Sequence, residues 1–168
     1  MEQGKRRTIS VLLTRYYSTF SNFIYWISGR GYTHASIALG DGNGYYYSFN
    51  FKGFRREYPG RRIRKCGKII CYKLEVSQES FERLQKRIDE MEGNKEELRY
   101  SRLSLILCLL HIPSKIEKCY FCSQFVAEML QLSECVSLRK ETSLYLPNHL
   151  SEELSIQRGL KEVLCNPI

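Results

Sequence analysis

Residues 33–51 read THASIALGDGNGYYYSFNF, and this stretch decides the fold. Two strand-like runs, residues 33–39 and 45–51, flank a turn at residues 41–44 with the sequence Asp-Gly-Asn-Gly. Asp-Gly and Asn-Gly pairs supply the positive φ angles that a tight hairpin turn requires. The sequence therefore predicts an antiparallel β-hairpin here.

The segments on either side of the hairpin carry strand and helix patterns in turn. Apolar, β-branched runs predict strands at residues 8–14 and 68–76. Apolar residues at helical spacing predict helices at residues 18–28, 77–93, 120–132 and 147–154. Residues 100–110 fit either a helix or a buried loop, and residues 52–66 read as a basic loop. This order favours the α+β class, with an antiparallel sheet packed against helices in a single domain over residues 1–168.

Composition narrows the class of protein. The chain has 168 residues, of which 43% are hydrophobic and 26% are charged, which suits one compact domain. Its longest apolar run, residues 103–112, is about half of what a membrane span needs. The N-terminus runs into a predicted strand without the apolar stretch of a secretory signal, so we expect a cytoplasmic protein. The seven cysteines are then not expected to form a disulfide framework, and Cys71 and Cys108 are expected to be buried as small apolar residues.

The net charge of +8 is concentrated in one segment, residues 55–68. A solvated loop rim is the first interpretation of this cluster, and a docking surface for an anionic partner is the second. The segment contains no helical or zinc-finger reading motif, so sequence-specific nucleic-acid binding is not expected.

Two residues have the placement that nucleophilic catalysis requires. Cys122 stands at the start of a predicted helix, where unpaired N–H groups and the helix dipole favour a thiolate. The same N–H groups can stabilise the oxyanion of a tetrahedral intermediate. His34 lies in the first hairpin strand, on a small, polar face shared with Ser36 and Ala38. A helix-borne cysteine with a strand histidine as its base is the arrangement of a cysteine hydrolase.

The segments around these two residues carry a family resemblance. Residues 33–39 with the Gly-rich turn, and residues 120–127 (YFCSQFVA), resemble the two motifs of circularly permuted papain-like proteins. This group includes the NlpC-type cell-wall peptidases and the lecithin:retinol acyltransferase group, in which the histidine precedes the cysteine. Residues 145–150 resemble the Pro-containing stretch that follows the cysteine helix in the bacterial branch. The resemblance implies a permuted papain-like fold, specific at the two motifs and vague between them.

In that family a third polar residue from the neighbouring strand orients the histidine. Ser48 is the first candidate for this place and Asn50 the second, since both fall on the face of His34 in the hairpin. Tyr16 and Tyr17 lie in the first strand-to-helix segment, which could add a side chain to the oxyanion hole.

The expected function is therefore a cysteine hydrolase of the peptidase or amidase type. Its catalytic residues would be Cys122, His34 and Ser48, its intermediate a thioacyl enzyme, and it would use no cofactor. An acyltransferase or lipid thioesterase on the same site, and a non-catalytic binding module of the same fold, are the alternatives. A zinc site is a further rival, since Cys119 and Cys122 form half of a structural-zinc signature and Cys66 and Cys71 could supply a second pair.

Overall fold

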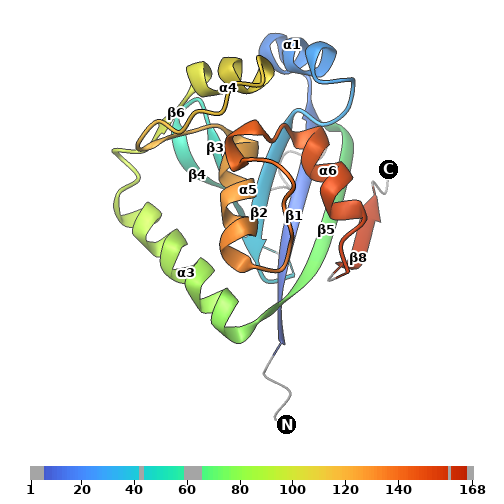
Figure 1. The fold of residues 1–168 in the computed structure, drawn as a ribbon, viewed down its shortest axis with the longest axis vertical. Coiled ribbons are helices and arrows are strands. Elements are labelled where there is room, and N and C mark those ends of the chain that lie inside the picture. The colour runs from blue at the N-terminus through green and yellow to red at the C-terminus, as the bar shows by residue number, and fades with distance from the viewer. Residues whose placement is uncertain (1–5, 42–43, 59–65, 159, 166–168) are drawn as a thin grey trace.

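A computed structural model describes residues 6–41, 44–58, 66–158 and 160–165, and it belongs to the α+β class (Figure 1). A six-stranded sheet has the order β4-β3-β2-β1-β5-β8, and every neighbouring pair is antiparallel. Its strands are β1 (Arg6–Tyr16), β2 (His34–Leu39), β3 (Tyr46–Asn50), β4 (Gly53–Glu57), β5 (Cys66–Ser77) and β8 (Leu160–Cys165). Two short strands, β6 (Arg99–Tyr100) and β7 (Cys119–Tyr120), pair in parallel beside it. The helices are α1 (Thr19–Ile27), α3 (Gln78–Gly93), α4 (Arg102–Leu109), α5 (Cys122–Ser133) and α6 (Pro147–Ser155), with a 3-10 helix at Thr142–Leu144.

The predicted hairpin is present. Strands β2 and β3 pair antiparallel, with Ile37 opposite Tyr47, and β2 also pairs with β1, with His34 opposite Thr14. Gly40 has a φ of 119° where β2 leaves the sheet, a conformation that suits glycine. The turn residues Gly42 and Asn43 lie outside the described residues.

The prediction of a basic loop at residues 52–66 was wrong in its first part. Residues 53–57 form β4, which extends the hairpin to a third strand, and β5 begins at Cys66. Phe54 and Glu57 are buried on opposite faces of the strand, while Arg55 and Arg56 are not buried, so the segment lacks the alternation that marks a strand in a sequence. Arg61, Arg62, Arg64 and Lys65, which carry most of the predicted anionic docking surface, lie outside the described residues. The sixth strand, β8, had no counterpart in the sequence prediction.

Serine side chains fix where three helices begin. Ser18, Ser77 and Ser101 cap α1, α3 and α4, and each accepts a hydrogen bond from the backbone N–H three residues later. Residues 102–109 are therefore helical, which settles the choice left open for that segment. Pro147 occupies the first turn of α6, where its missing N–H costs no hydrogen bond, and the helix predicted at residues 147–154 is present.

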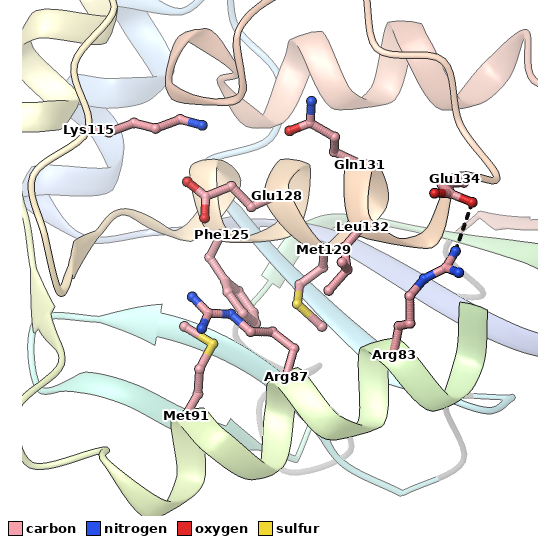
Figure 2. Close-up of a pocket in the computed structure, with 10 residues that line it drawn as sticks. All are labelled: Arg83, Arg87, Met91, Lys115, Phe125, Glu128, Met129, Gln131, Leu132 and Glu134. Atoms are coloured by element: carbon pink, nitrogen blue, oxygen red, sulfur yellow. Dashed lines mark hydrogen bonds and ion pairs between the residues drawn. The ribbon is translucent and has the colours of Figure 1, made fainter. Parts of the chain in front are cut away.

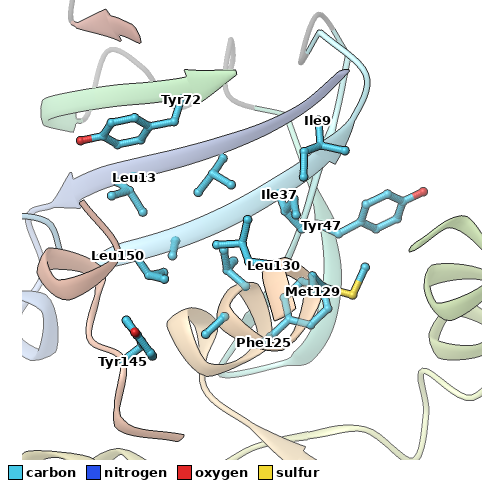
Figure 3. Close-up of a cluster of buried hydrophobic side chains, with 14 of the residues drawn as sticks. Ile9, Leu13, Ile37, Tyr47, Tyr72, Phe125, Met129, Leu130, Tyr145 and Leu150 are labelled. Atoms are coloured by element: carbon cyan, nitrogen blue, oxygen red, sulfur yellow. The ribbon is translucent and has the colours of Figure 1, made fainter. Parts of the chain in front are cut away.

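The main core lies between the sheet and three helices, α3, α5 and α6 (Figures 1 and 3). Ile9, Leu13 and Ile37 point from the sheet toward Phe125 and Leu130 of α5, and all five are almost fully buried. Alternate residues of the same strands form a smaller cluster on the opposite face: Leu12, Ala38, Tyr46, Ile69 and Cys71. Cys71 and Cys108 are both buried, as predicted.

A third cluster joins α1 to α4 at one end of the molecule (Figure 1). Ile24 of α1 packs there with Leu105 and Cys108 of α4, and with Phe121 just before α5. This cluster fixes the N-terminus of α5 between the two short helices. None of the helices in the described ranges is long and apolar enough to cross a bilayer.

Candidate active site

A cavity of about 240 Å³ opens where β2 begins and α5 begins. Both predicted reactive residues, Cys122 and His34, line it, together with Asn50 and Glu57. The remaining walls are mostly aromatic, from Tyr16, Phe20, Phe49, Phe51 and Tyr100. The fold thus brings together two residues that are 88 positions apart in the chain.

His34 is held at the first position of β2 by a hydrogen-bonded loop. The Thr33 N–H donates to the Thr14 carbonyl at 2.9 Å, which starts the pairing with β1. The Tyr32 N–H donates to Oδ1 of Asn148 at 2.7 Å, and Nδ2 of Asn148 donates to the Ser28 carbonyl at 2.7 Å. Asn148, in the first turn of α6, therefore ties the loop between α1 and β2 to the C-terminal half of the chain. Its part in the site was not predicted.

Cys122 is the first residue of α5, as the sequence predicted. The residue before it, Phe121, is fully buried in the cluster between α1 and α4, so the helix start is fixed by packing. A phenyl ring cannot cap a helix, and the side chain of Phe121 makes no hydrogen bond to the N–H groups of this first turn. These N–H groups and the positive end of the helix dipole therefore lie next to the Cys122 thiol, where they favour negative charge.

Glu57 is the acidic partner of His34, and sequence reasoning missed it. Its Oε2 lies 2.8 Å from Nε2 of His34, and both side chains are almost completely buried. Ser48, the predicted third residue, also reaches Nε2, with its Oγ at 3.1 Å. Asn50, the second candidate, donates to Oε1 of Glu57 at 3.5 Å. Both predicted candidates thus lie at the site, but the carboxylate makes the shortest contact with the imidazole.

This network fixes the proton positions on the imidazole. A carboxylate can only accept, and the Ser48 hydroxyl already donates to the Ala35 carbonyl at 2.8 Å. Nε2 of His34 therefore carries a proton, which it donates to Glu57 and Ser48. Nδ1 is then the ring nitrogen left for the side-chain hydrogen bond with Cys122.

Opposing effects act on the pKa of His34. Burial lowers it, since a cation is poorly solvated in the interior, but the charge of Glu57 and the hydrogen bonds with Cys122 and Glu57 raise it. The net result is a His34 pKa well above its ordinary value of 6.5. This network favours the protonated form of His34, with one N–H toward Glu57 and the other toward Cys122.

A sequence signal for Glu57 did exist. It is the only Asp or Glu between Asp41 and Glu75, in a segment rich in Lys and Arg. A lone carboxylate in such a segment calls for an explanation. The structure provides it, because Glu57 is buried in β4 and pairs with His34. The assignment of the segment to a loop concealed this.

The structure also shows which of the other side chains considered from the sequence lie at the cavity and which do not. Tyr16 lines the cavity, with its ring 5.3 Å from the His34 ring, whereas Tyr17 is exposed and stacks with Arg15. Among the described residues no three His, Cys, Asp or Glu side chains are grouped as metal ligands. The side chain of Cys66, part of the second predicted zinc pair, lies outside the described residues.

A larger cavity of about 520 Å³ lies between α3 and α5, away from Cys122 (Figure 2). Its floor is apolar, from Phe125, Met129 and Leu132, and charged residues form its rim. Arg83 is already paired with Glu79 and Glu134. Neither a cysteine nor a histidine is among the described residues that line this cavity, so the smaller cavity is the candidate site.

Comparison with protein-family models finds no matching family, and a search of curated proteins finds no match to this chain. The likeness of residues 33–39 and 120–127 to the permuted papain-like proteins therefore remains a resemblance of motifs. A functional assignment has to come from the geometry of the cavity.

Proposed function

We propose that this chain is a cysteine hydrolase in which Cys122 is the nucleophile, His34 the acid–base residue and Glu57 the residue that orients His34. One observation carries the proposal: a cysteine at an uncapped helix N-terminus shares a cavity and a hydrogen bond with a buried, carboxylate-paired histidine. Nucleophile, base and orienting group in series form the general arrangement of covalent hydrolases.

In the first half of the reaction, the Cys122 thiolate attacks the carbonyl carbon of an amide or ester. The proton that left the thiol resides on Nδ1 of His34, where the raised pKa of His34 holds it. Negative charge that develops on the carbonyl oxygen is stabilised by the N–H groups of the first turn of α5. His34 then gives its proton to the leaving nitrogen or oxygen, the bond from carbon to that atom breaks, and a thioester on Cys122 remains.

In the second half, water attacks the thioester carbon and His34 accepts its proton. The bond between carbon and Sγ breaks, a carboxylic acid leaves, and the thiolate–imidazolium pair is restored. Glu57 keeps the imidazole in one orientation through both halves, and it stabilises the cation that forms in each. Ser48 supports the same ring nitrogen with a second, weaker contact.

The walls of the cavity bear on the substrate. Phe51 is in edge contact with both Phe20 and Tyr100, with ring centroids 5.0 Å and 5.1 Å apart. Aromatic walls next to the nucleophile favour an apolar group on the carbonyl carbon, either an acyl chain or a bulky side chain. Acyl transfer to an acceptor other than water would use the same residues.

Selective alkylation of Cys122 tests the proposal before any substrate is known. Cys122 is more buried than Cys119 or Cys135, so exposure alone would make it the slowest of the three to react with iodoacetamide. We expect Cys122 to react first at pH 6.5, as located by peptide mass mapping, and to lose this advantage in His34→Ala. Preferential labelling of Cys119 in the folded protein would contradict the proposal.

A turnover assay provides the second arm of the test. Short-chain 4-nitrophenyl esters should give a burst of one nitrophenolate per chain and an acyl adduct on Cys122. Cys122→Ala should remove both, and Cys119→Ala, the matched control three residues away, should keep both. Equal turnover in Cys122→Ala would leave a binding module of this fold as the better interpretation.

A further inference from the structure

Helices α1 and α4 expose apolar side chains on the face that points away from the core. Six large residues of this face are between 45% and 62% exposed. They are Phe23, Trp26 and Ile27 from α1 and Leu103, Ile106 and Leu110 from α4 and its C-terminal residue. Because α1 and α4 pack on each other through Ile24, Leu105 and Cys108, these residues belong to one continuous end of the molecule (Figure 1). We call them the α1–α4 surface.

Helix α3 of the same protein shows what an ordinary surface helix looks like. Its apolar residues Leu84, Ile88 and Met91 are buried, and Glu, Lys, Arg and Gln fill its outer face. In α4 two of the three buried residues, Leu105 and Cys108, are apolar, the exposed Leu103 and Ile106 are apolar as well, and Arg102 is its only charged residue. Helix α1 has no charged residue at all. Helices that are apolar on both faces are expected inside a protein or in contact with an apolar medium.

The charged residues of the two segments that contain α1 and α4 all have one sign. No Asp or Glu occurs between residues 6 and 40 or between residues 99 and 116, the two segments that contain these helices. Two cations of these segments lie over aromatic rings next to this surface: Arg30 over Trp26 at 4.4 Å and Arg102 over Phe51 at 5.0 Å. An apolar face with cations and no carboxylates is complementary to an apolar medium with an anionic border.

The α1–α4 surface also borders the mouth of the Cys122 cavity. Phe20 of α1 lines the cavity and packs in the cluster that joins α1 to α4. Phe51 lines the cavity as well, is more than half exposed, and contacts both Phe20 and Tyr100. The cavity therefore opens next to the exposed apolar side chains.

We propose that the α1–α4 surface docks on the interface of a membrane that contains anionic phospholipids. Trp26 and Phe23 would enter the boundary between headgroups and acyl chains, where aromatic side chains are favoured, and Arg30 and Arg102 would lie among the phosphates. With nine and eight residues, α1 and α4 are about 12 to 14 Å long, so they lie on the membrane and do not cross it.

Docking in this orientation brings the mouth of the cavity to the lipid headgroups. A substrate with an apolar chain could then pass from the membrane to the aromatic walls without entering water. This consequence for the substrate rests on the proposed function of Cys122, whereas docking itself does not. Cys122→Ala is therefore expected to bind membranes like the wild-type protein, and the two proposals can fail separately.

The fluorescence of Trp26 tests the docking directly, because it is the only tryptophan in the chain. Vesicles of phosphatidylcholine with about 30% phosphatidylglycerol should shift its emission to the blue and sediment the protein. Binding to these vesicles should be about tenfold stronger than to phosphatidylcholine alone, and it should weaken as salt is added. Brominated acyl chains should quench Trp26.

Two variants locate the docking surface. Ile106→Glu combined with Leu110→Glu should reduce vesicle binding about tenfold or more, since both side chains are exposed and their replacement leaves the core intact. Ile156→Glu is the matched control, because Ile156 is just as exposed but follows the far end of α6 (Figure 1). Equal binding by the double variant and the wild-type protein would overturn the proposal. So would an unchanged Trp26 spectrum, or a dimer in solution that shields Trp26 from a water-soluble quencher.

Discussion

Replacing Glu57 by Gln separates the role of its charge from the role of its shape. The amide keeps the size of the side chain and an oxygen that can accept from Nε2 of His34, but it removes the negative charge. That charge is the largest of the effects that raise the pKa of His34, and burial acts in the opposite direction. We therefore expect the pKa of His34 to be lower in Glu57→Gln than in the wild-type protein.

The size of the effect follows from the geometry of the pair. Opposite charges 2.8 Å apart attract by about 6 kcal/mol at an effective dielectric constant of about 20. Burial of both ions cancels part of this, and removing one partner of a buried pair costs about 3 to 5 kcal/mol. Since Gln keeps an acceptor, we expect Glu57→Gln to lower the free energy of unfolding by about 3 kcal/mol at pH 6.

The pH dependence identifies the source of this loss. A histidine with a raised folded-state pKa contributes stability that is complete below its unfolded pKa of about 6.5 and disappears as the pH rises through the folded value. The difference between wild-type protein and Glu57→Gln should therefore shrink toward about 1 kcal/mol once the pH exceeds the folded pKa of His34. The wild-type protein should lose stability as the pH rises above 6.5, and Glu57→Gln should not show this loss.

Urea unfolding at several pH values and NMR titration of the imidazole signals measure the two effects. The chain has three histidines, so the absence of one signal in His34→Ala assigns the titration. Glu92→Gln is the control, because Glu92 pairs with Arg56 near the surface and its loss should cost about 0.5 kcal/mol at every pH. An unchanged His34 midpoint in Glu57→Gln, or a stability loss that does not vary with pH, would refute the assignment of Glu57.

Three further substitutions test neighbouring features. Ser48→Ala should lower the free energy of unfolding in urea by about 1 to 2 kcal/mol. It should keep the wild-type pH profile of Cys122 alkylation, because the Glu57 carboxylate still holds His34. A loss of that profile would return the orienting role to Ser48. Gly53→Ala should destabilise by about 2 kcal/mol or more in the same assay, since Gly53 has a φ of 87° and a Cβ would lie 2.4 Å from the Leu98 carbonyl oxygen; unchanged stability would show that the turn relaxes. Tyr145→Phe should lower the thermal midpoint by several degrees, because its buried hydroxyl accepts from two backbone N–H groups, and an unaltered midpoint would mean that these groups find other partners.

Patterns that depend on neighbours in the chain could be predicted from the sequence. The Asp-Gly-Asn-Gly turn with its flanking runs predicted the β2–β3 hairpin, and apolar residues at helical spacing predicted α1 and α3. The face shared by His34, Ser48 and Asn50 followed from strand alternation. The structure places His34 and Asn50 in the wall of one cavity and Ser48 behind it, within hydrogen-bond distance of His34. Each of these rests on a local rule of geometry.

Features that depend on a distant partner could not be predicted in the same way. Strand β4 is stabilised by Phe54 in the core and by the pair of Arg56 with Glu92 of α3, and neither contact can be read from residues 53–57. Asn148 reaches back 116 positions to the Tyr32 N–H. Strand β8 pairs with β5 across 86 to 95 positions in the chain. The exposed apolar faces of α1 and α4 also look like core faces until the fold shows that nothing in the described part of the chain covers them.

The sequence analysis missed both β4 and the role of Glu57, and the two omissions have the same physical origin. A carboxylate is seldom buried unless a cation or several donors accompany it, so Glu57 in a basic segment is ordinarily assigned to solvent. Here the accompanying cation is a histidine 23 positions earlier, and the strand that buries Glu57 is also what brings it to that histidine. The burial of Glu57 and the protonation of His34 therefore depend on each other, since neither ion is stable in this interior without its partner. Because the pair stabilises β4 at this edge of the sheet, Glu57→Gln should increase the hydrogen-exchange rates of the β4 amides more than those of the β1 amides.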